Sequence, residues 1–217
     1  MVHILGQQNS ILNRFIAEIR DEEIQKDSMR FRRNLERIGE IFAYEISKEL
    51  SYEKRDVTTP LGTTEVSLPV DVPVLAAILR AGIPFHNGFL NYFDDAQNAF
   101  LGSFRKYHKN NTFEIKSSYI SSPVLEGKVL ILADTMLASG SSVALAYNDL
   151  LQKGTPKHVH VAAVIAAREG VEYLKEYIPE DRLTLWIGAL DNELTAKSYI
   201  VPGLGDAGDL AYGVKAD

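Results

Sequence analysis

Short apolar runs alternate with segments of helical character along residues 73–187, and this alternation constrains the fold most strongly. The apolar runs are residues 73–79, 128–133, 158–165 and 182–187, and the helical segments between them are residues 82–93, 142–152 and 169–177. A continuous apolar run of this length is typical of a central strand in a parallel sheet, which is buried on both faces. Parallel neighbours need a crossover between them, and a helix usually provides it. We therefore predict an α/β fold with a mainly parallel twisted sheet flanked by helices.

Residues 1–50 are predicted to be helical and to lie outside this sheet. One helix is expected to start at Asn9 or Ser10 and a second at Asp27 or Ser28, because these side chains can accept hydrogen bonds from a first helical turn. The helices are surplus to the sheet, so we expect an N-terminal appendage that is available for subunit contacts.

A projecting β-hairpin is predicted for residues 98–122, with a polar tip at residues 109–111. Residues 51–72 contain turns between short β-like runs. The chain has 217 residues, close to the usual size of one domain. We expect one domain over residues 1–217, made of the helical appendage (1–50) and a core (73–190).

Composition excludes several classes of protein. The chain has no cysteine, which excludes a disulfide scaffold, a thiolate zinc or iron–sulfur site and a thiol nucleophile. Its 23 basic and 29 acidic side chains give a net charge of −6, which argues against non-specific nucleic-acid binding. No stretch is apolar for long enough to span a membrane, and the N-terminus shows no secretory signal. We therefore expect a cytoplasmic protein.

The strongest local signal lies at residues 129–142, where a buried strand is expected to end at Asp134 and a helix to begin near Ser142. The helix start presents unpaired backbone N–H groups and the positive end of the helix dipole. A phosphate suits this position, and Gly140 lets the backbone approach it closely. Asp134 would then face hydroxyl groups or a divalent metal on the same ligand. The alternative is a polar loop that only caps the helix, while a Walker A motif is excluded because no Gly-Lys-Ser/Thr follows.

Two further segments can carry chemistry. Arg80 ends the first core strand, where its guanidinium could bind a diphosphate through two hydrogen bonds or form an ordinary salt bridge. Residues 199–209 are rich in glycine, and residues 203–208 match the dinucleotide-binding pattern G-x-G-x-x-G. We reject the dinucleotide site, because too few residues follow Gly208 for the long helix that it needs. The glycines instead predict an irregular loop whose backbone groups hydrogen-bond the edge of a flat base.

Two other clusters are interpreted as structural. His158 and His160 alternate on a predicted strand and share one face, but a metal would need further ligands. Arg30, Arg32 and Arg33 stand together near the start of the second helix. A solvated face or a subunit contact is favoured for them over a phosphate site.

Three segments, at residues 79–82, 134–140 and 199–209, resemble in order and spacing those of the uracil phosphoribosyltransferases, a family with the type I phosphoribosyltransferase fold. The resemblance implies transfer of the phosphoribosyl group from 5-phospho-α-D-ribose 1-diphosphate (PRPP) to uracil, giving UMP and diphosphate in pyrimidine salvage. It also implies Mg²⁺ carried with PRPP, no further metal site, and assembly into a homo-oligomer, a dimer or higher.

The same resemblance implies roles for single residues. Catalytic roles fall on Arg80, Arg105, Asp134 and Asp206. Contacts to PRPP fall on Arg80, Arg105, Asp134, Thr135, Met136, Leu137, Ala138, Ser139, Gly140, Ser141, Ser142 and Asp206. Contacts to uracil fall on Ile200, Gly205, Asp206 and Ala207, within a base-binding loop at residues 199–213. The hairpin near residues 105–122 is implied to be a lid that excludes water.

The chain departs from the family pattern at several positions. Thr135 stands where the family usually has proline and Ser141 where it has glycine, and Pro84 and Asn87 follow the Arg-Ala-Gly segment. We expect these departures to affect turnover and regulation more than the class of ligand. Two rival functions stay open. A pyrimidine-nucleotide-sensing, RNA-binding regulator on the same fold is disfavoured by the charge, and a phosphoribosyltransferase for another nucleobase is disfavoured by the tail segment.

Overall fold

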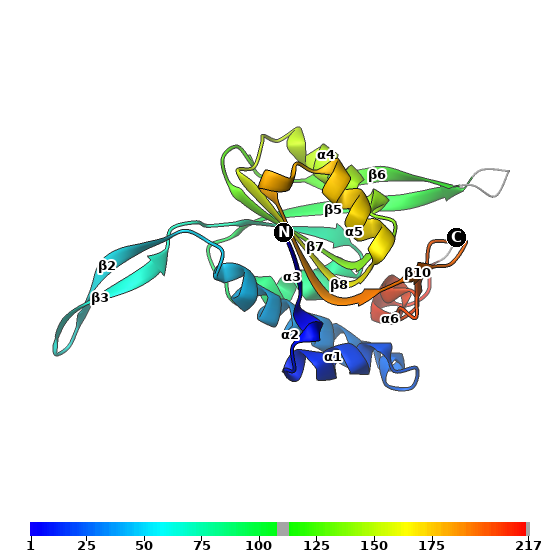
Figure 1. Ribbon diagram of the computed structural model, residues 1–217, viewed down its shortest axis with the longest axis horizontal. Coiled ribbons are helices and arrows are strands. Elements are labelled where there is room, and N and C mark those ends of the chain that lie inside the picture. Colours follow the sequence, from blue (N-terminus) through cyan, green and yellow to red (C-terminus); the bar gives the residue numbers. More distant parts are fainter. Residues whose placement is uncertain (108–112, 216–217) are drawn as a thin grey trace.

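A seven-stranded sheet forms the centre of the molecule, in the order β1-β9-β8-β7-β4-β5-β6 (Figure 1). The computed structural model describes the backbone of residues 1–107 and 113–215, and the side chains of residues 1–102 and 119–215. The strands are β1 (Val2–Ile4), β4 (Val74–Leu79), β5 (Gln97–Tyr107), β6 (Phe113–Ser121), β7 (Val129–Leu137), β8 (His158–Ala167) and β9 (Leu183–Asp191). All neighbours are parallel except β5 and β6, which are antiparallel. The predicted α/β fold is confirmed.

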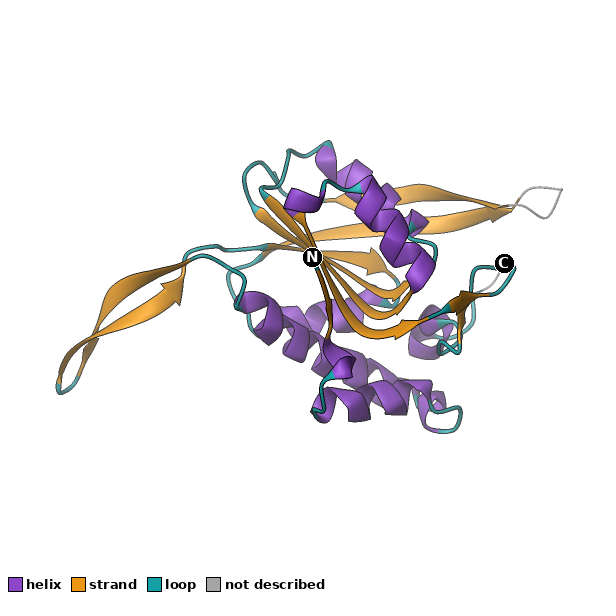
Figure 2. Ribbon diagram, viewed as in Figure 1, coloured by secondary structure: helices purple, strands orange, loops and turns teal. Residues whose placement is uncertain are grey.

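Helices cover both faces of this sheet (Figure 2). The helices α1 (Ile11–Arg20), α2 (Ser28–Ser47) and α3 (Gly82–Leu90) lie on one face, and α4 (Ser141–Leu151) and α5 (Arg168–Tyr177) lie on the other. Side chains alternate between the faces along each strand, so each face has its own hydrophobic core. Leu75 and Ile131 pack on the side of α1–α3, and Val74 and Leu130 pack on the side of α4 and α5.

The N-terminal helices are part of the core, which corrects the expectation of an appendage over residues 1–50. Leu12, Ile19 and Leu35 are fully buried against the sheet, and burying one such side chain is worth about 1.5–3 kcal/mol. The predicted helix starts are confirmed, because Ser10 accepts a hydrogen bond from the Leu12 N–H and the Asp27 side chain caps α2. The strand β1 was not predicted. It has three residues and is paired with β9 at the far end of the chain.

Two hairpins project from the body of the molecule (Figure 1). The predicted hairpin is formed by β5 and β6, and its expected tip at residues 109–111 lies outside the described residues. A second hairpin pairs β2 (Tyr52–Thr59) with β3 (Gly62–Pro69), and every side chain in it is exposed. Only turns and short β-like runs were expected there.

The C-terminal tail is short and irregular. It contains β10 (Glu193–Leu194), β11 (Ile200–Val201) and α6 (Ala207–Tyr212), and 3₁₀ turns elsewhere span Leu5–Gln7, Ile24–Lys26 and Glu180–Arg182. With six residues, α6 is too short to be the long helix of a dinucleotide-binding unit. No helix in the described ranges has the length and apolar character that crossing a bilayer requires.

The sheet topology places a crevice at the carboxyl ends of β4 and β7, which are neighbours. The chain leaves β4 through α3 on one face and returns in β5, whereas it leaves β7 through α4 on the opposite face and returns in β8. Where successive crossovers diverge in this way, the loops separate and leave room for a ligand.

Candidate active site

A cavity of about 630 Å³ lies at this crevice. Three stretches of chain line it: the end of β4, the β7–α4 connection and the C-terminal tail. Of the residues implicated by the sequence, the cavity is lined by Arg80, Asp134, Thr135, Met136, Leu137, Ala138, Ser139, Gly140, Ser142, Ile200, Gly205, Asp206 and Ala207. Ser141 does not line it. Arg105 lies in β5 opposite Ile115 of β6, and its side chain is outside the described part of the chain.

The strand β7 is longer than expected, which corrects the predicted loop. Asp134 lies within the strand, which continues to Leu137 because β8 pairs with it as far as Ala166. The connection to α4 is therefore confined to Ala138, Ser139 and Gly140. Gly140 has φ +84°, and a Cβ there would lie 2.7 Å from Cδ1 of Tyr173. Only glycine fits this turn without strain.

The start of α4 is open to an anion. Its N-cap residue, Gly140, has no side chain that could cap the first turn, and the Ser141 N–H makes only a long hydrogen bond of 3.5 Å to Oγ of Ser139. The Oγ atoms of Ser139 and Ser141 lie 3.0 Å apart and hydrogen-bond each other. Ser139 and Ser141 are thus bonded to each other, while Ser139, Ser142 and Val143 line the cavity and Ser141 does not. The unpaired N–H groups and the helix dipole favour a negative charge here.

Asp134 is a carboxyl group of raised pKa in the cavity wall. Its Oδ1 accepts a weak hydrogen bond from the Met136 N–H at 3.4 Å. Burial raises its pKa from 3.8 to about 6, because desolvation disfavours the charged form. The group is mainly a carboxylate at neutral pH and can accept hydrogen bonds from hydroxyl groups.

Arg80 forms a salt bridge inside the cavity. Its Nη2 atom donates to Oδ1 of Asp209 at 2.8 Å and to the carbonyl oxygen of Gly213 at 3.2 Å. Its Nε atom is buried and has no hydrogen-bond partner among the described residues. The peptide bond between Leu79 and Arg80 is cis. An N–H that is buried without a partner costs free energy, so a ligand oxygen placed beside Nε would relieve that cost.

The tail contributes a glycine-rich wall. Asp206 accepts a hydrogen bond from the Asp209 N–H through Oδ1 at 3.0 Å and so caps α6. Its other oxygen lies 3.7 Å from Nζ of Lys215. Gly205 has φ +94°, and a Cβ there would meet nothing within 4 Å. Asp206 therefore combines a structural task with its place in the cavity wall.

The described lining is more acidic than basic. Arg80 and Lys215 are its cations, and Asp134, Asp206 and Asp209 are its carboxylates. A ligand with several phosphates therefore needs an additional cation, and one or two carboxylates together with substrate phosphates are the usual ligands of Mg²⁺. Sequence reasoning assigned no role to Asp209 and Lys215. The spacing of Asp206 and Asp209, three residues apart, is an N-cap signal that could have shown that Asp206 starts a helix.

The clusters interpreted as structural have partners within the protein. Nδ1 of His160 accepts from the indole N–H of Trp186 at 3.1 Å, and the described residues contain no group of three potential metal ligands. The three arginines of α2 make separate contacts: Arg30 with Glu18, Arg32 with the carbonyl oxygen of Ala211, and Arg33 with Glu36.

Comparison with known proteins identifies close relatives. The model of the family "Uracil phosphoribosyltransferase" matches residues 6–214. A uracil phosphoribosyltransferase of Porphyromonas gingivalis is 57% identical over 211 residues, which are 97% of each chain. One of Pyrococcus furiosus is 38% identical over 91% of this chain and 84% of its own. The solved AQ2163 protein from Aquifex aeolicus superposes over 100% of both chains, with a TM-score of 0.86 and 29% identity.

Proposed function

The chain belongs to the uracil phosphoribosyltransferase family, and from this premise we propose how its own residues carry out the reaction. The enzyme transfers the phosphoribosyl group of PRPP to uracil and releases diphosphate, and the product is UMP. The observation that supports the proposed roles is that the end of β4, the β7–α4 connection and the tail line one and the same cavity. Each stretch would bind one part of the two substrates.

The 5′-phosphate of PRPP is proposed to bind at the start of α4. The support is the sharp turn at Gly140, an N-cap residue without a side chain, which leaves the backbone N–H groups that follow Ser141 in the first turn available. The hydroxyl groups of Ser139 and Ser142 add donors on the cavity side. This phosphate does not react, so its binding serves to place the ribose correctly.

The diphosphate is proposed to bind at Arg80. The buried Nε atom supports this assignment, because its N–H has no partner within the described chain and a phosphate oxygen would provide one. When diphosphate leaves, negative charge grows on its oxygens and positive charge grows on the ribose. A guanidinium placed beforehand at the leaving group stabilises that change. Arg105 is proposed as a second phosphate ligand on the family resemblance alone.

Mg²⁺ is proposed to enter with PRPP. The acidic lining fits this, because a polyanionic donor bound beside Asp134, Asp206 and Asp209 requires a counter-charge. Bound to the donor, Mg²⁺ supplies positive charge beside the diphosphate. Asp134 is proposed to accept hydrogen bonds from the ribose hydroxyl groups, for which its ionised form at neutral pH is suited.

Uracil is proposed to bind against the tail, between Ile200 and Ala207. Both residues are buried, and Gly205 between them leaves its backbone accessible because it carries no side chain. Backbone N–H and C=O groups can match the alternating acceptors and donors along the edge of uracil. Held this way, the base would present N1 to the ribose, and hydrogen bonds to its oxygens favour the N1-deprotonated form that attacks.

Calorimetric titration of the purified protein with PRPP tests these roles directly. We expect tight binding with Mg²⁺, much weaker binding when EDTA removes the metal, and weaker binding by Arg80→Ala in either condition. Arg182→Ala serves as the control, because this exposed arginine lies outside the cavity. Equal PRPP affinity of Arg80→Ala and the wild type would contradict the assignment of the diphosphate.

We also propose that the protein is cytoplasmic and has no nucleic-acid partner. The net charge of −6 supports the latter, and the former follows from the charged donor, which cannot cross a membrane unaided. Filter binding of RNA with and without UMP tests the regulatory alternative. A tight, nucleotide-dependent complex would support that alternative instead.

A homo-oligomer, a dimer or higher, is proposed as the working form. The β2–β3 hairpin supports this, because an isolated two-stranded ribbon is marginally stable alone and this one exposes Val57, Leu61, Val66 and Leu68. Light scattering on the full chain and on a variant with charged residues at Val66 and Leu68 tests the assembly. A monomeric wild type at micromolar concentration would contradict it.

A further inference from the structure

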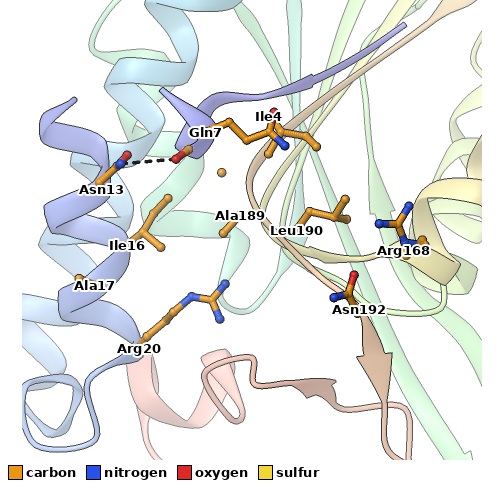
Figure 3. A pocket seen from close by; sticks show the side chains of 12 residues that line it. Ile4, Gln7, Asn13, Ile16, Ala17, Arg20, Arg168, Ala189, Leu190 and Asn192 are labelled. Carbon is orange, nitrogen blue, oxygen red and sulfur yellow. Dashed lines mark hydrogen bonds between the residues drawn. The ribbon is translucent and has the colours of Figure 1, made fainter. Parts of the chain in front are cut away.

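Arg20 and Asp191 form a bidentate ion pair that contacts the C-terminal tail. Nη1 of Arg20 lies 2.9 Å from Oδ2 of Asp191, and Nη2 lies 2.9 Å from Oδ1. Arg20 is the last residue of α1 and Asp191 the last residue of β9, so the pair connects elements at opposite ends of the chain. Figure 3 shows the Arg20 side chain extending from α1 into a second cavity, of about 530 Å³, which α1 and the end of β9 line.

The pair holds both backbone polar groups of one buried residue, Gly203. Nη1 of Arg20 donates to the Gly203 carbonyl oxygen at 3.1 Å, and the Gly203 N–H donates to Oδ2 of Asp191 at 2.9 Å. Asp191 is only 7% exposed, so these charge-assisted hydrogen bonds are largely shielded from water. Removing one partner would leave the other charge buried without compensation.

Gly203 is the turn of the uracil-binding segment, yet it does not line the site. It has φ +56°, and a Cβ there would lie 2.1 Å from the carbonyl oxygen of Ile200. Ile200 before it and Gly205 after it do line the cavity. Ile200 lies three residues before Gly203 and Gly205 two residues after it, so the chain between them has little conformational freedom. The hydrogen bonds that hold Gly203 therefore also restrict Ile200 and Gly205, the two residues that would face the base.

The same layer of helices holds the tail at a second point. Nη1 of Arg32, in α2, donates to the carbonyl oxygen of Ala211, and its guanidinium lies 5.9 Å from the centre of the Tyr212 ring. Within the described residues, the hydrogen bonds and ion pairs of Arg20 and Asp191 go to each other and to Gly203, and none reaches the end of β4 or the β7–α4 connection, which are proposed to bind PRPP. The ion pair therefore acts on the uracil side of the site.

We propose that Arg20 and Asp191 are positioning residues that hold the uracil-binding segment in its base-accepting shape, so that the pair sets the KM for uracil. The proposal rests on the function assigned above, because it supposes that residues 200–207 bind the base. Backbone hydrogen bonds to a flat base depend on sub-ångström placement, and a loop that must first be ordered binds more weakly.

Steady-state kinetics on Arg20→Ala, Arg20→Lys, Asp191→Asn and the double variant test the proposal. We expect Arg20→Ala to raise the KM for uracil by about tenfold or more, and to leave kcat at saturating uracil and the affinity for PRPP within roughly threefold. Arg20→Lys should recover part of the loss, since it restores the charge without the two-pronged geometry. The double variant should be no worse than the worse single variant, because the pair acts as a unit.

Arg30→Ala is the matched control, since it breaks an ion pair with the buried Glu18 in the same helical layer without touching the tail. A uracil KM that rises equally in Arg30→Ala and Arg20→Ala, or that rises together with the Kd for PRPP, would overturn the proposal. If Arg20→Ala does not fold, Arg20→Lys and Asp191→Asn carry the same comparison. A wild type that makes no UMP would refute the assigned function, whereas an active wild type with unchanged variants would refute only this inference.

Discussion

Arg80 and Asp209 are 129 residues apart in the chain, and Nη2 of Arg80 donates to Oδ1 of Asp209 at 2.8 Å. This contact joins the end of β4 to α6, and so it joins the stretch proposed to bind diphosphate to the tail proposed to bind uracil. A Cβ at Gly208 would lie 3.4 Å from Nη2 of Arg80, so a larger residue at position 208 would crowd the guanidinium. The arginine is held ready for a ligand before one binds.

Replacing Arg80 should therefore disable catalysis. We expect Arg80→Ala to lower kcat by several orders of magnitude, each tenfold loss corresponding to about 1.4 kcal/mol of barrier. Asp206→Asn should have an effect of similar size, because this residue both caps α6 and lines the cavity. Steady-state assays with Arg182→Ala as the control check this. Wild-type turnover by either purified variant would refute the roles given to these residues.

The pH dependence of activity should depend on Asp134. Its pKa of about 6 means that the carboxylate becomes protonated as the pH falls through 6, and it is then a weaker acceptor for the hydrogen bonds that we propose it receives from ribose. We expect kcat/KM for PRPP to fall below pH 6 in the wild type. Asp134→Asn should have low activity without this decline, and any decline that remains belongs to the phosphates of the substrate. Identical pH profiles would contradict the assignment.

The raised pKa of Asp134 also predicts that the protein becomes more stable when the charge of this side chain is removed. A carboxyl group whose pKa rises from 3.8 to about 6 on folding stabilises the protein below pH 4, and this stabilisation is lost as the pH rises through 6. Asp134→Asn should therefore unfold at a higher temperature than the wild type at pH 8, and the gain should be smaller at pH 4. Thermal unfolding at the two pH values measures this. An equal gain at both would exclude desolvation as its cause.

Gly140 should tolerate no side chain. Gly140→Ala adds a Cβ that would lie 2.7 Å from Tyr173 at φ +84°, so we expect a loss of about 1–3 kcal/mol and weaker binding of PRPP. Gly127→Ala is the matched control, because Gly127 also has a positive φ, +68°, but its Cβ would meet nothing within 4 Å. Urea unfolding and PRPP titration of both variants separate backbone strain from the clash. Equal losses would contradict the account of this turn.

The buried His160 should make the protein less stable in mild acid. Burial, together with the nearby His158 and His3, lowers its pKa from 6.5 to about 3. The stability that comes from keeping the ring neutral is complete above pH 6.5 and is lost as the pH falls toward 3. His160→Gln can still accept from the Trp186 indole, and it should lose less stability between pH 7 and pH 5 than the wild type. Urea unfolding at both pH values measures the difference, and equal losses would contradict this reading.

The sequence predicted the central sheet well because its strands are buried on both faces and read as continuous apolar runs. It did not predict β1, whose three residues are too few for a pattern and whose partner, β9, begins at Leu183. It predicted only short β-like runs and turns at residues 51–72, and not that β2 and β3 pair into a projecting hairpin, because both faces of that ribbon are exposed and no apolar face marks its pairing. A buried strand can be recognised in the sequence by its apolar residues, whereas a pair of strands exposed on both faces has no such pattern.

The candidate site was likewise predicted only in part from the sequence. Arg80, Asp134 and Gly205 line the cavity, and they could be predicted as site residues because each lies in a short stretch of recognisable composition. The Arg20–Asp191 pair was not foreseen, because an arginine at the end of a helix carries no sign of a partner 171 residues away. Such partners become visible only when the chain is folded.

The proposed function requires that the tail selects uracil over the other bases. The most direct measurement gives the purified protein, Mg²⁺ and PRPP together with uracil, cytosine, orotate, hypoxanthine and adenine in competition, and follows nucleotide and diphosphate. We predict UMP as the nucleotide formed, with one diphosphate released for each UMP. Formation of another nucleotide in preference, or no UMP from uracil, would contradict the account.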